Sequence, residues 1–401
     1  MDKKKVILNS LLFSVPAFIL VIPGAGEAPF AIISLWSMLY CHKEKINPFK
    51  CEHTKLFSFI VIAYFFTSFL SVIASDPSLY AFKRLGTNFH FLVAPWLAAF
   101  LLKKLTFSAL SRSVKVGAIC AGLVALVQYF YFDRRAGGVV NEIIFGDISL
   151  LLAFFALINL FNESAKEKVF SLLSFSLGLS AVIFSLSRGA WVVAPILFPV
   201  LIFIWHKQEA ISKSSLIAIC MLATVIISTA SLSPQVQSRF KLMNSEITEY
   251  KDTNFTSIGA RITLWKAALH VFPNHPIFGY GLHNTKLAAS DFFQSEKSKN
   301  SIAYYDHFHN EYLNTLVGKG LIGFLGLLVI LFVPIRFFLK SIKYGTESNY
   351  AALGIILCIG YIFFGLTNIT FGHGILNTFF VFVLAACNHA FYTTSQIEIK
   401  E

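Results

Sequence analysis

Residues 56–75 read LFSFIVIAYFFTSFLSVIAS, twenty consecutive positions without a charged side chain. A helix of this length rises about 30 Å, which matches the hydrocarbon core of a bilayer. The rest of the chain has the same character: 56% of its 401 residues are hydrophobic and 13% are charged, and its mean hydropathy is +0.68. Because soluble domains carry about 25% charged residues, the sequence predicts an integral membrane protein.

Further apolar stretches of similar length lie on both sides of this segment, and they predict an all-α protein with about twelve transmembrane helices. We expect a first unit over residues 1–232 with nine helices, an outer loop over 233–311, and a second unit over 312–401 with three helices and a short tail. The predicted spans are 6–22, 28–41, 56–75, 85–102, 113–132, 143–161, 169–186, 189–206, 213–232, 312–335, 350–370 and 373–392.

The outer loop lacks any apolar run of spanning length. It nevertheless contains Ile262, Trp265, Leu269 and Phe272 at helical spacing, so we predict a short amphipathic helix there. The predicted helix follows Ser257 and ends before two nearby prolines.

Lysine and arginine side chains set the expected orientation, because they are retained on the cytoplasmic side of the membrane. With the N-terminus inside, the cytoplasmic segments hold nineteen basic residues and the short outer loops hold five. Both termini are therefore expected in the cytoplasm, and the loop 233–311 is expected outside. The net charge of +12 is accounted for largely by this bias. No basic stripe with interleaved aromatic residues is present, so membrane lipids and not nucleic acid are the expected partners.

Arg188 is the best-supported candidate for a functional residue. It lies in Ser187-Arg188-Gly189-Ala190-Trp191, where two spans meet with almost no loop between them. A charged residue in such a place marks a ligand site by default. The alternative is an arginine that reaches toward lipid headgroups, with Trp191 as an interfacial anchor.

Arg261 falls in the first turn of the predicted outer helix. Backbone N–H groups at a helix N-terminus favour an anion, and a guanidinium there adds two-point recognition of phosphate. A salt bridge to a loop acid such as Asp252 is the competing interpretation.

The segment Asp306-His307-Phe308-His309-Asn310 precedes the tenth span. Histidine titrates near neutral pH and can act as a general base, although a histidine at an interface also serves as a polar cap. Two histidines two positions apart do not share a helical face, so we expect no metal site.

Lys83, Arg84 and Arg135 enlarge the positive outer face. Each alone indicates headgroup contact as readily as substrate binding; together they predict a cationic outer cavity. A diphosphate is the anion that would fit it best.

At these residues the sequence resembles the O-antigen ligases, a family related to O-antigen polymerases and protein O-oligosaccharyltransferases. The resemblance covers most of the chain in layout. Four local matches carry it, namely Ser187 to Trp191, Arg261 to Gly281, His309 to Gly323, and Ile144 to Asp147 after Arg135.

The resemblance implies an inner-membrane glycosyltransferase that moves a polysaccharide from undecaprenyl diphosphate to a lipid A-core sugar at the periplasmic face, without metal or other cofactor. It implies Arg188 and Arg261 as diphosphate ligands and His309 as the base. The pairing of His309 with Asn310 favours this histidine over His307. The remaining substrate-binding candidates are Lys83, Arg84, Arg135, Trp191, Trp265, Tyr280, His307 and Asn310.

Other functions stay open at this point. A polymerase or a protein O-oligosaccharyltransferase would use the same kind of donor, and the short C-terminal tail disfavours the latter. A lipid flippase or anion transporter would bind the anion in transit, but no internal repeat of the kind found in many transporters is evident.

The topology prediction can be tested with single cysteines in a cysteine-free background, one at Ser245 and one at Ser348. We expect an impermeant thiol reagent to label only the cysteine at 245 in intact spheroplasts. Labelling of both positions would contradict the assigned orientation.

Overall fold

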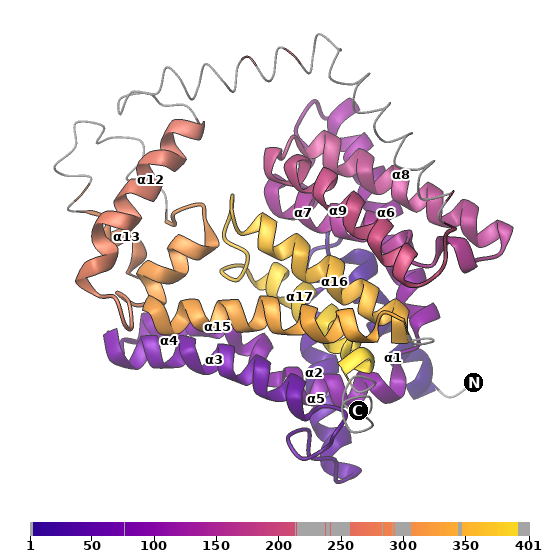
Figure 1. The fold of residues 1–401 in the computed structure, drawn as a ribbon, viewed down its shortest axis with the longest axis horizontal. Coiled ribbons are helices and arrows are strands. Elements are labelled where there is room, and N and C mark those ends of the chain that lie inside the picture. Colours follow the sequence, from indigo (N-terminus) through magenta and orange to yellow (C-terminus); the bar gives the residue numbers. More distant parts are fainter. Residues whose placement is uncertain are drawn as a thin grey trace.

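The computed structural model describes residues 3–75, 77–212, 257–282, 284–290, 306–343 and 347–391, together with Ser214, Gln237, Lys241 and Phe292. The regular elements in these ranges are all helical (Figure 1). The α-helices are α1 (Lys3–Phe18), α2 (Glu27–Lys43), α3 (Lys55–Ser75), α4 (Leu79–Leu85), α5 (Phe89–Lys104), α6 (Phe107–Phe130), α7 (Glu142–Ala156), α8 (Ala165–Ser185), α9 (Arg188–Lys207), α12 (Ser257–Val271), α13 (Thr285–Ala288), α15 (Glu311–Ser341), α16 (Glu347–Phe364) and α17 (Gly374–Ala386). Three short 3-10 helices are η1 (Gly86–Asn88), η2 (Leu160–Asn162) and η3 (Phe272–Asn274).

Eight helices in the described part of the chain are long and apolar enough to cross a membrane. They correspond to predicted spans, with α4, η1 and α5 forming one of them and α7 with η2 another. The helices α1, α2 and α17 coincide with predicted spans but have only 16, 17 and 13 residues. The predicted span 213–232 lies outside the described residues. The all-helical membrane class is therefore confirmed, whereas the number twelve stays a prediction.

Polar caps explain where several helices begin. The side chains of Thr106, Asn141 and Ser164 accept hydrogen bonds from the first turns of α6, α7 and α8. Backbone N–H groups at a helix start have no partner within the helix, and such caps satisfy some of them. Helix α12 begins at Ser257, and η3, which contains Pro273, follows it.

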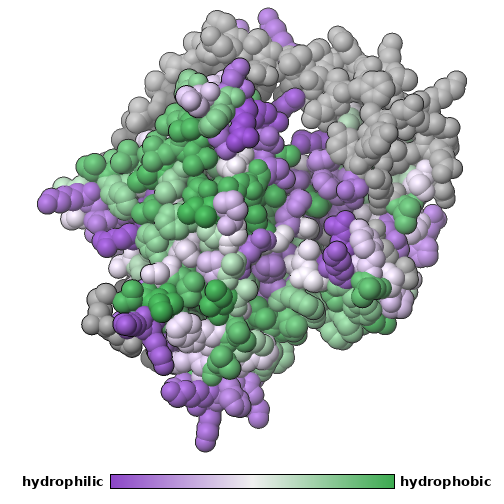
Figure 2. Space-filling model, turned by 180° about the vertical axis from the view of Figure 1, so that it is seen from behind, coloured by the Kyte–Doolittle hydropathy of each residue, from purple (hydrophilic) through white to green (hydrophobic). Residues whose placement is uncertain are grey.

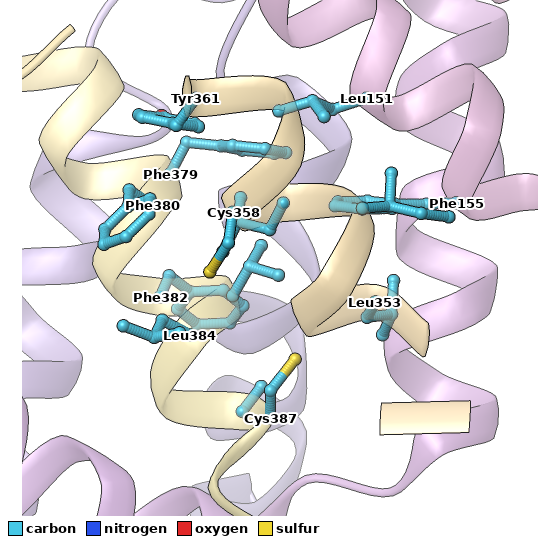
Figure 3. Close-up of a cluster of buried hydrophobic side chains, with 14 of the residues drawn as sticks. Leu151, Phe155, Leu353, Cys358, Tyr361, Phe379, Phe380, Phe382, Leu384 and Cys387 are labelled. Atoms are coloured by element: carbon cyan, nitrogen blue, oxygen red, sulfur yellow. The ribbon is translucent and has the colours of Figure 1, made fainter. Parts of the chain in front are cut away.

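The centre of the bundle is formed by α7, α16 and α17, all almost completely buried. Figure 3 shows Leu151 and Phe155 of α7 packed against Leu353 and Cys358 of α16 and Phe379 of α17. Many apolar side chains on the peripheral helices stay exposed, and Figure 2 shows broad hydrophobic areas on one face with hydrophilic areas above and below. This distribution is the one expected for helices that face lipid.

Helix α15 is the longest of the described helices, with 31 residues, and it runs beside α3 (Figure 1). It is interrupted at Gly320, whose φ of 64° and ψ of −165° are not helical. Two carbonyls of the loop 276–281 accept hydrogen bonds from the N–H groups that follow the interruption. Leu321 N donates to Pro276 O (2.8 Å) and Ile322 N to Ile277 O (3.3 Å). In return, the N–H groups of residues 280 and 281 donate to the carbonyls of residues 317 and 318 at 2.8 and 3.0 Å. The loop 276–281 is thereby fixed to α15.

Both positions chosen for cysteine labelling should be replaced. Ser348 is only 6% exposed, and its hydroxyl oxygen accepts a hydrogen bond from Gln208 Nε2 (2.9 Å). Ser245 lies outside the described residues. Lys343 and Asn274 are exposed and are better placed to report the inner and outer sides.

Substitution of Gly320 tests the break in α15. A Cβ at Gly320 would lie 2.2 Å from Ile277 O, and the positive φ adds about 1–2 kcal/mol of strain. We expect Gly320→Ala to lower the melting temperature of the detergent-purified protein more than Gly24→Ala, where φ is +72° but nothing lies within 4 Å. Gly86→Ala, which meets neither obstacle, should melt like wild type. Equal melting of the Gly320 and Gly24 variants would show that the loop contact is dispensable.

Candidate active site

Arg188 stands at the first position of α9, on a turn of two residues that follows the end of α8 at Ser185. Leu186 in this turn has a φ of 53°, which is uncommon for a residue other than glycine. The side chain of Arg188 is exposed. The indole of Trp191 donates to Val182 O at 3.0 Å, so its N–H is used to fasten the turn while its ring is 43% exposed.

Arg261 is carried by α12, which packs against the start of α15. One apolar face of α12, including Leu264, contacts Phe308 and Val317. Trp265 Nε1 donates to Phe308 O at 3.1 Å. The indole predicted to bind substrate therefore connects the helix of Arg261 to residues 306–310, which we call the histidine segment.

The histidine segment is held at its middle by Phe308, which is 2% exposed. His307 and His309 lie on either side with their ring centroids 4.2 Å apart. The backbone N–H of His309 donates to His307 Nδ1 at 3.1 Å, and His309 has a φ of 48°. A left-handed residue of this type is a form of backbone strain that often occurs at functional sites.

This contact separates the two histidines chemically. Because Nδ1 of His307 accepts a hydrogen bond, a neutral His307 carries its proton on Nε2. Nε2 of His307 is then a hydrogen-bond donor. The geometry therefore favours His309 over His307 as the proton acceptor.

Both imidazoles resist protonation. Burial, followed by the charges of Arg261 and His373, lowers the pKa of His309 to about 4. Burial and the neighbouring His309 and His373 lower the pKa of His307 to about 3. Because a lowered pKa keeps an imidazole neutral until the pH falls to that value, both rings are neutral at pH 7.

His373, at the N-terminus of α17, is a member of this cluster that the sequence prediction missed. Its ring lies 6.4 Å from that of His307 and perpendicular to it. The charge of Arg84 acts on His373, so α4 also faces the cluster. A histidine between two glycines at the start of a predicted span, Gly372-His373-Gly374, was the signal available in the sequence.

The segment after the histidines is fixed by Asn310 and Glu311. Asn310 caps α15 through a bond from Leu313 N (3.0 Å), and its Nδ2 donates to Leu366 O (3.2 Å). The buried carboxylate of Glu311 accepts from Thr370 N (2.7 Å) and Phe371 N (3.0 Å). Asn310, predicted to bind substrate, is thus engaged with the turn that leads toward His373.

The same turn connects the histidines to Arg188. Gly189, next to Arg188, lies so close to Thr367 that an added Cβ would be 2.6 Å from its hydroxyl. Thr367 directly follows Leu366, the partner of Asn310. The Arg188 and His309 segments therefore approach the turn 365–367 from two sides.

Helix α7 connects the two arginines in a similar way. A Cβ on Gly146 would lie 3.0 Å from Ser187 Cβ. The next residue, Asp147, is 1% exposed and is within electrostatic range of Arg261. The oxygen Oδ2 of Asp147 has no hydrogen-bond partner in the described part of the chain.

The remaining predicted residues are less closely tied to this cluster. Tyr280 donates its hydroxyl to Val271 O at 3.3 Å and its ring stacks edge-on with His275, so it supports the outer loop. Lys83 is exposed on α4. Arg135 lines a separate cavity of about 250 Å³ and donates two hydrogen bonds to Ser185 O. Among the described residues, no three His, Cys, Asp or Glu side chains are arranged to hold a metal.

These features define a multi-pass, all-helical membrane protein with arginine and histidine side chains gathered at the ends of several helices. Residues 173–328 match a family model described as O-Antigen ligase. The matched part contains Arg188, Arg261 and His309, and the resemblance predicted from the sequence is confirmed. Residues 173–328 are thus similar to the O-antigen ligase family, whose members are glycosyltransferase-type enzymes.

Two relatives are informative. An uncharacterized protein of Haemophilus influenzae is 27% identical over 375 residues, covering 90% of this chain and 92% of its own length. An O-antigen ligase of Escherichia coli K12 is 23% identical over 205 residues, which cover 49% of this chain and 46% of that protein.

Proposed function

We propose that this protein is an O-antigen ligase, which transfers a polysaccharide from undecaprenyl diphosphate to a lipid A-core sugar at the periplasmic face of the bacterial inner membrane. Arg188 and Arg261 bind the diphosphate, and His309 is the general base. The main support is the position of Arg261, whose charge acts on His309 while the turn 365–367 connects the same segment to Arg188.

The chemistry follows from these positions. The acceptor hydroxyl oxygen attacks the anomeric carbon of the donor sugar, and the bond from that carbon to the diphosphate oxygen breaks. Undecaprenyl diphosphate leaves with the electron pair and gains negative charge, which the two guanidinium groups stabilise. The hydroxyl proton passes to His309 and then to solvent. In this proposal the guanidinium groups supply the positive charge, so no metal is needed.

The low pKa of His309 fits this cycle. The charge of Arg261 helps keep the free imidazole neutral. A bound diphosphate offsets that charge, so it raises the pKa of His309 and strengthens the base when substrate is present. The positioning contacts of Trp265 and Asn310 hold His309 in place. In this proposal Lys83 and Arg84 surround the diphosphate or the acceptor, and His307 supports His309 by accepting a hydrogen bond from its backbone N–H.

Analysis of the gene deletion together with a reconstituted assay tests the proposed reaction. A strain without the protein should accumulate long glycan on the polyprenyl carrier and carry core lipopolysaccharide without chains, and the purified protein should join the two. Cores that bear a single repeat unit would instead identify a polymerase. Purified protein that moves the donor without forming a glycosidic bond would identify a transporter.

Substitution of the two histidines tests the base. Loss of a general base typically costs about 100- to 10,000-fold in rate, so His309→Ala should be nearly inactive while still binding donor. His307→Asn should retain most activity, because an amide oxygen can accept the bond from His309 N. With a pKa of about 4 for His309, kcat/KM should stay nearly flat from pH 8 to 5 and fall only near pH 4. The reference histidine pKa of about 6.5 would have placed that fall about 2.5 pH units higher. A near-normal rate for His309→Ala would exclude this residue as the base.

A further inference from the structure

The direction of Arg188 depends on a very short turn. Only Leu186 and Ser187 separate the last residue of α8 from Arg188. We refer to residues 185–188 as the arginine turn. Leu186 is left-handed, and Ser187 N donates to Ser185 Oγ at 3.1 Å. A turn of this kind has few conformations. A contact that fixes the position of Ser185 therefore also fixes the orientation of Arg188.

The loop 131–141, between α6 and α7, holds Ser185. Arg135 donates from both Nε and Nη2 to Ser185 O, each at 3.1 Å. The N–H of the next residue, Ala136, donates to Phe184 O at 2.9 Å. Three hydrogen bonds therefore connect this loop to the last two residues of α8.

The loop is itself rigid. Gln128 Oε1 accepts from the N–H groups of Gly137 and Gly138, both at 2.9 Å. Gly138 has a φ of +56°, and an added Cβ there would lie 2.1 Å from Leu20 O. Val139 N donates to that same carbonyl at 3.1 Å. The loop is thus fixed to α6 and to the chain after α1, and it can act as a firm support.

We infer that Arg135 is a positioning residue that orients Arg188 by holding the arginine turn, and that its contribution to the reaction does not come from contact with substrate. The inference rests on the proposed function. A guanidinium can offer two N–H groups to one carbonyl and complements the negative end of α8, whereas an ammonium would keep the charge but lose the two-point geometry. This role differs from the substrate contact that the sequence suggested for Arg135.

A charge-conserving pair of variants tests this role. Arg135→Lys should lower kcat by about 10- to 100-fold, in line with the effect of about 1 Å of misplacement at a distant support, with little change in acceptor KM. Arg134→Lys is the matched control, because the neighbouring Arg134 lies over the ring of Phe132 and holds no part of the turn. It should keep wild-type kinetics. Activity retained in Arg135→Lys would overturn the inference, since a lysine preserves charge but not the turn.

A double-mutant cycle tests whether Arg135 affects kcat through Arg188. If Arg135 acts through Arg188, then adding Arg135→Lys to an Arg188→Lys protein should cause little further loss of kcat. Additive losses would mean that Arg135 contacts substrate independently, and the inference would be wrong although the proposed function would stand. Full activity of Arg188→Lys alone would instead remove the diphosphate clamp from the proposed function. Should Arg135→Lys fail to fold, Gln128→Leu removes the hydrogen bonds to Gly137 N and Gly138 N that hold the loop of Arg135, without removing a charge, and should also lower kcat.

Discussion

The architecture of the site depends on how one broken helix satisfies its backbone. At Gly320 the helical hydrogen bonds of α15 are interrupted, and unpaired backbone groups are costly beside a bilayer. The loop 276–281 supplies the missing partners. That contact ties the outer loop to α15 and so limits where α12 can lie. Arg261 and the histidine segment face each other because both are anchored to the same end of α15.

Much of the fold was predictable because lipid imposes a strong constraint on sequence. Spans such as 56–75 are recognisable from apolar length alone. A helix was also predicted where α12 lies, but Leu269 of its predicted apolar face is 60% exposed, and the buried face is formed by Ala260, Leu264, Ala267, Ala268 and Val271. The interruption of α15 and the shortness of α17 were not predictable, because neither alters the apolar pattern. The interruption of α15 accompanies a tertiary contact, between Gly320 and Ile277, that leaves no periodic trace in the sequence.

The residue types in the sequence predicted where the candidate site lies better than they predicted the role of each residue in it. The histidine segment and Arg261 do lie close together, yet Trp265, Asn310 and Arg135 donate hydrogen bonds to backbone carbonyls. A sequence shows that a side chain can donate but not which acceptor it reaches. His373 was missed for the related reason that its neighbours come from distant parts of the chain. The proton preference of His307 likewise depends on a single backbone N–H.

The length of α15 has a consequence for how substrates arrive. Its 31 residues would rise about 46 Å, against about 30 Å for the hydrocarbon core. The part from Gly320 to Ser341 is long enough to fill that core, so in the proposed orientation the preceding turns rise through the headgroup layer. The histidine segment then lies among headgroups, where lipid-linked sugars also sit. Under the proposed function, donor and acceptor can then meet by two-dimensional diffusion, and neither the polyprenyl chain of the donor nor the acyl chains of the acceptor need to leave the membrane.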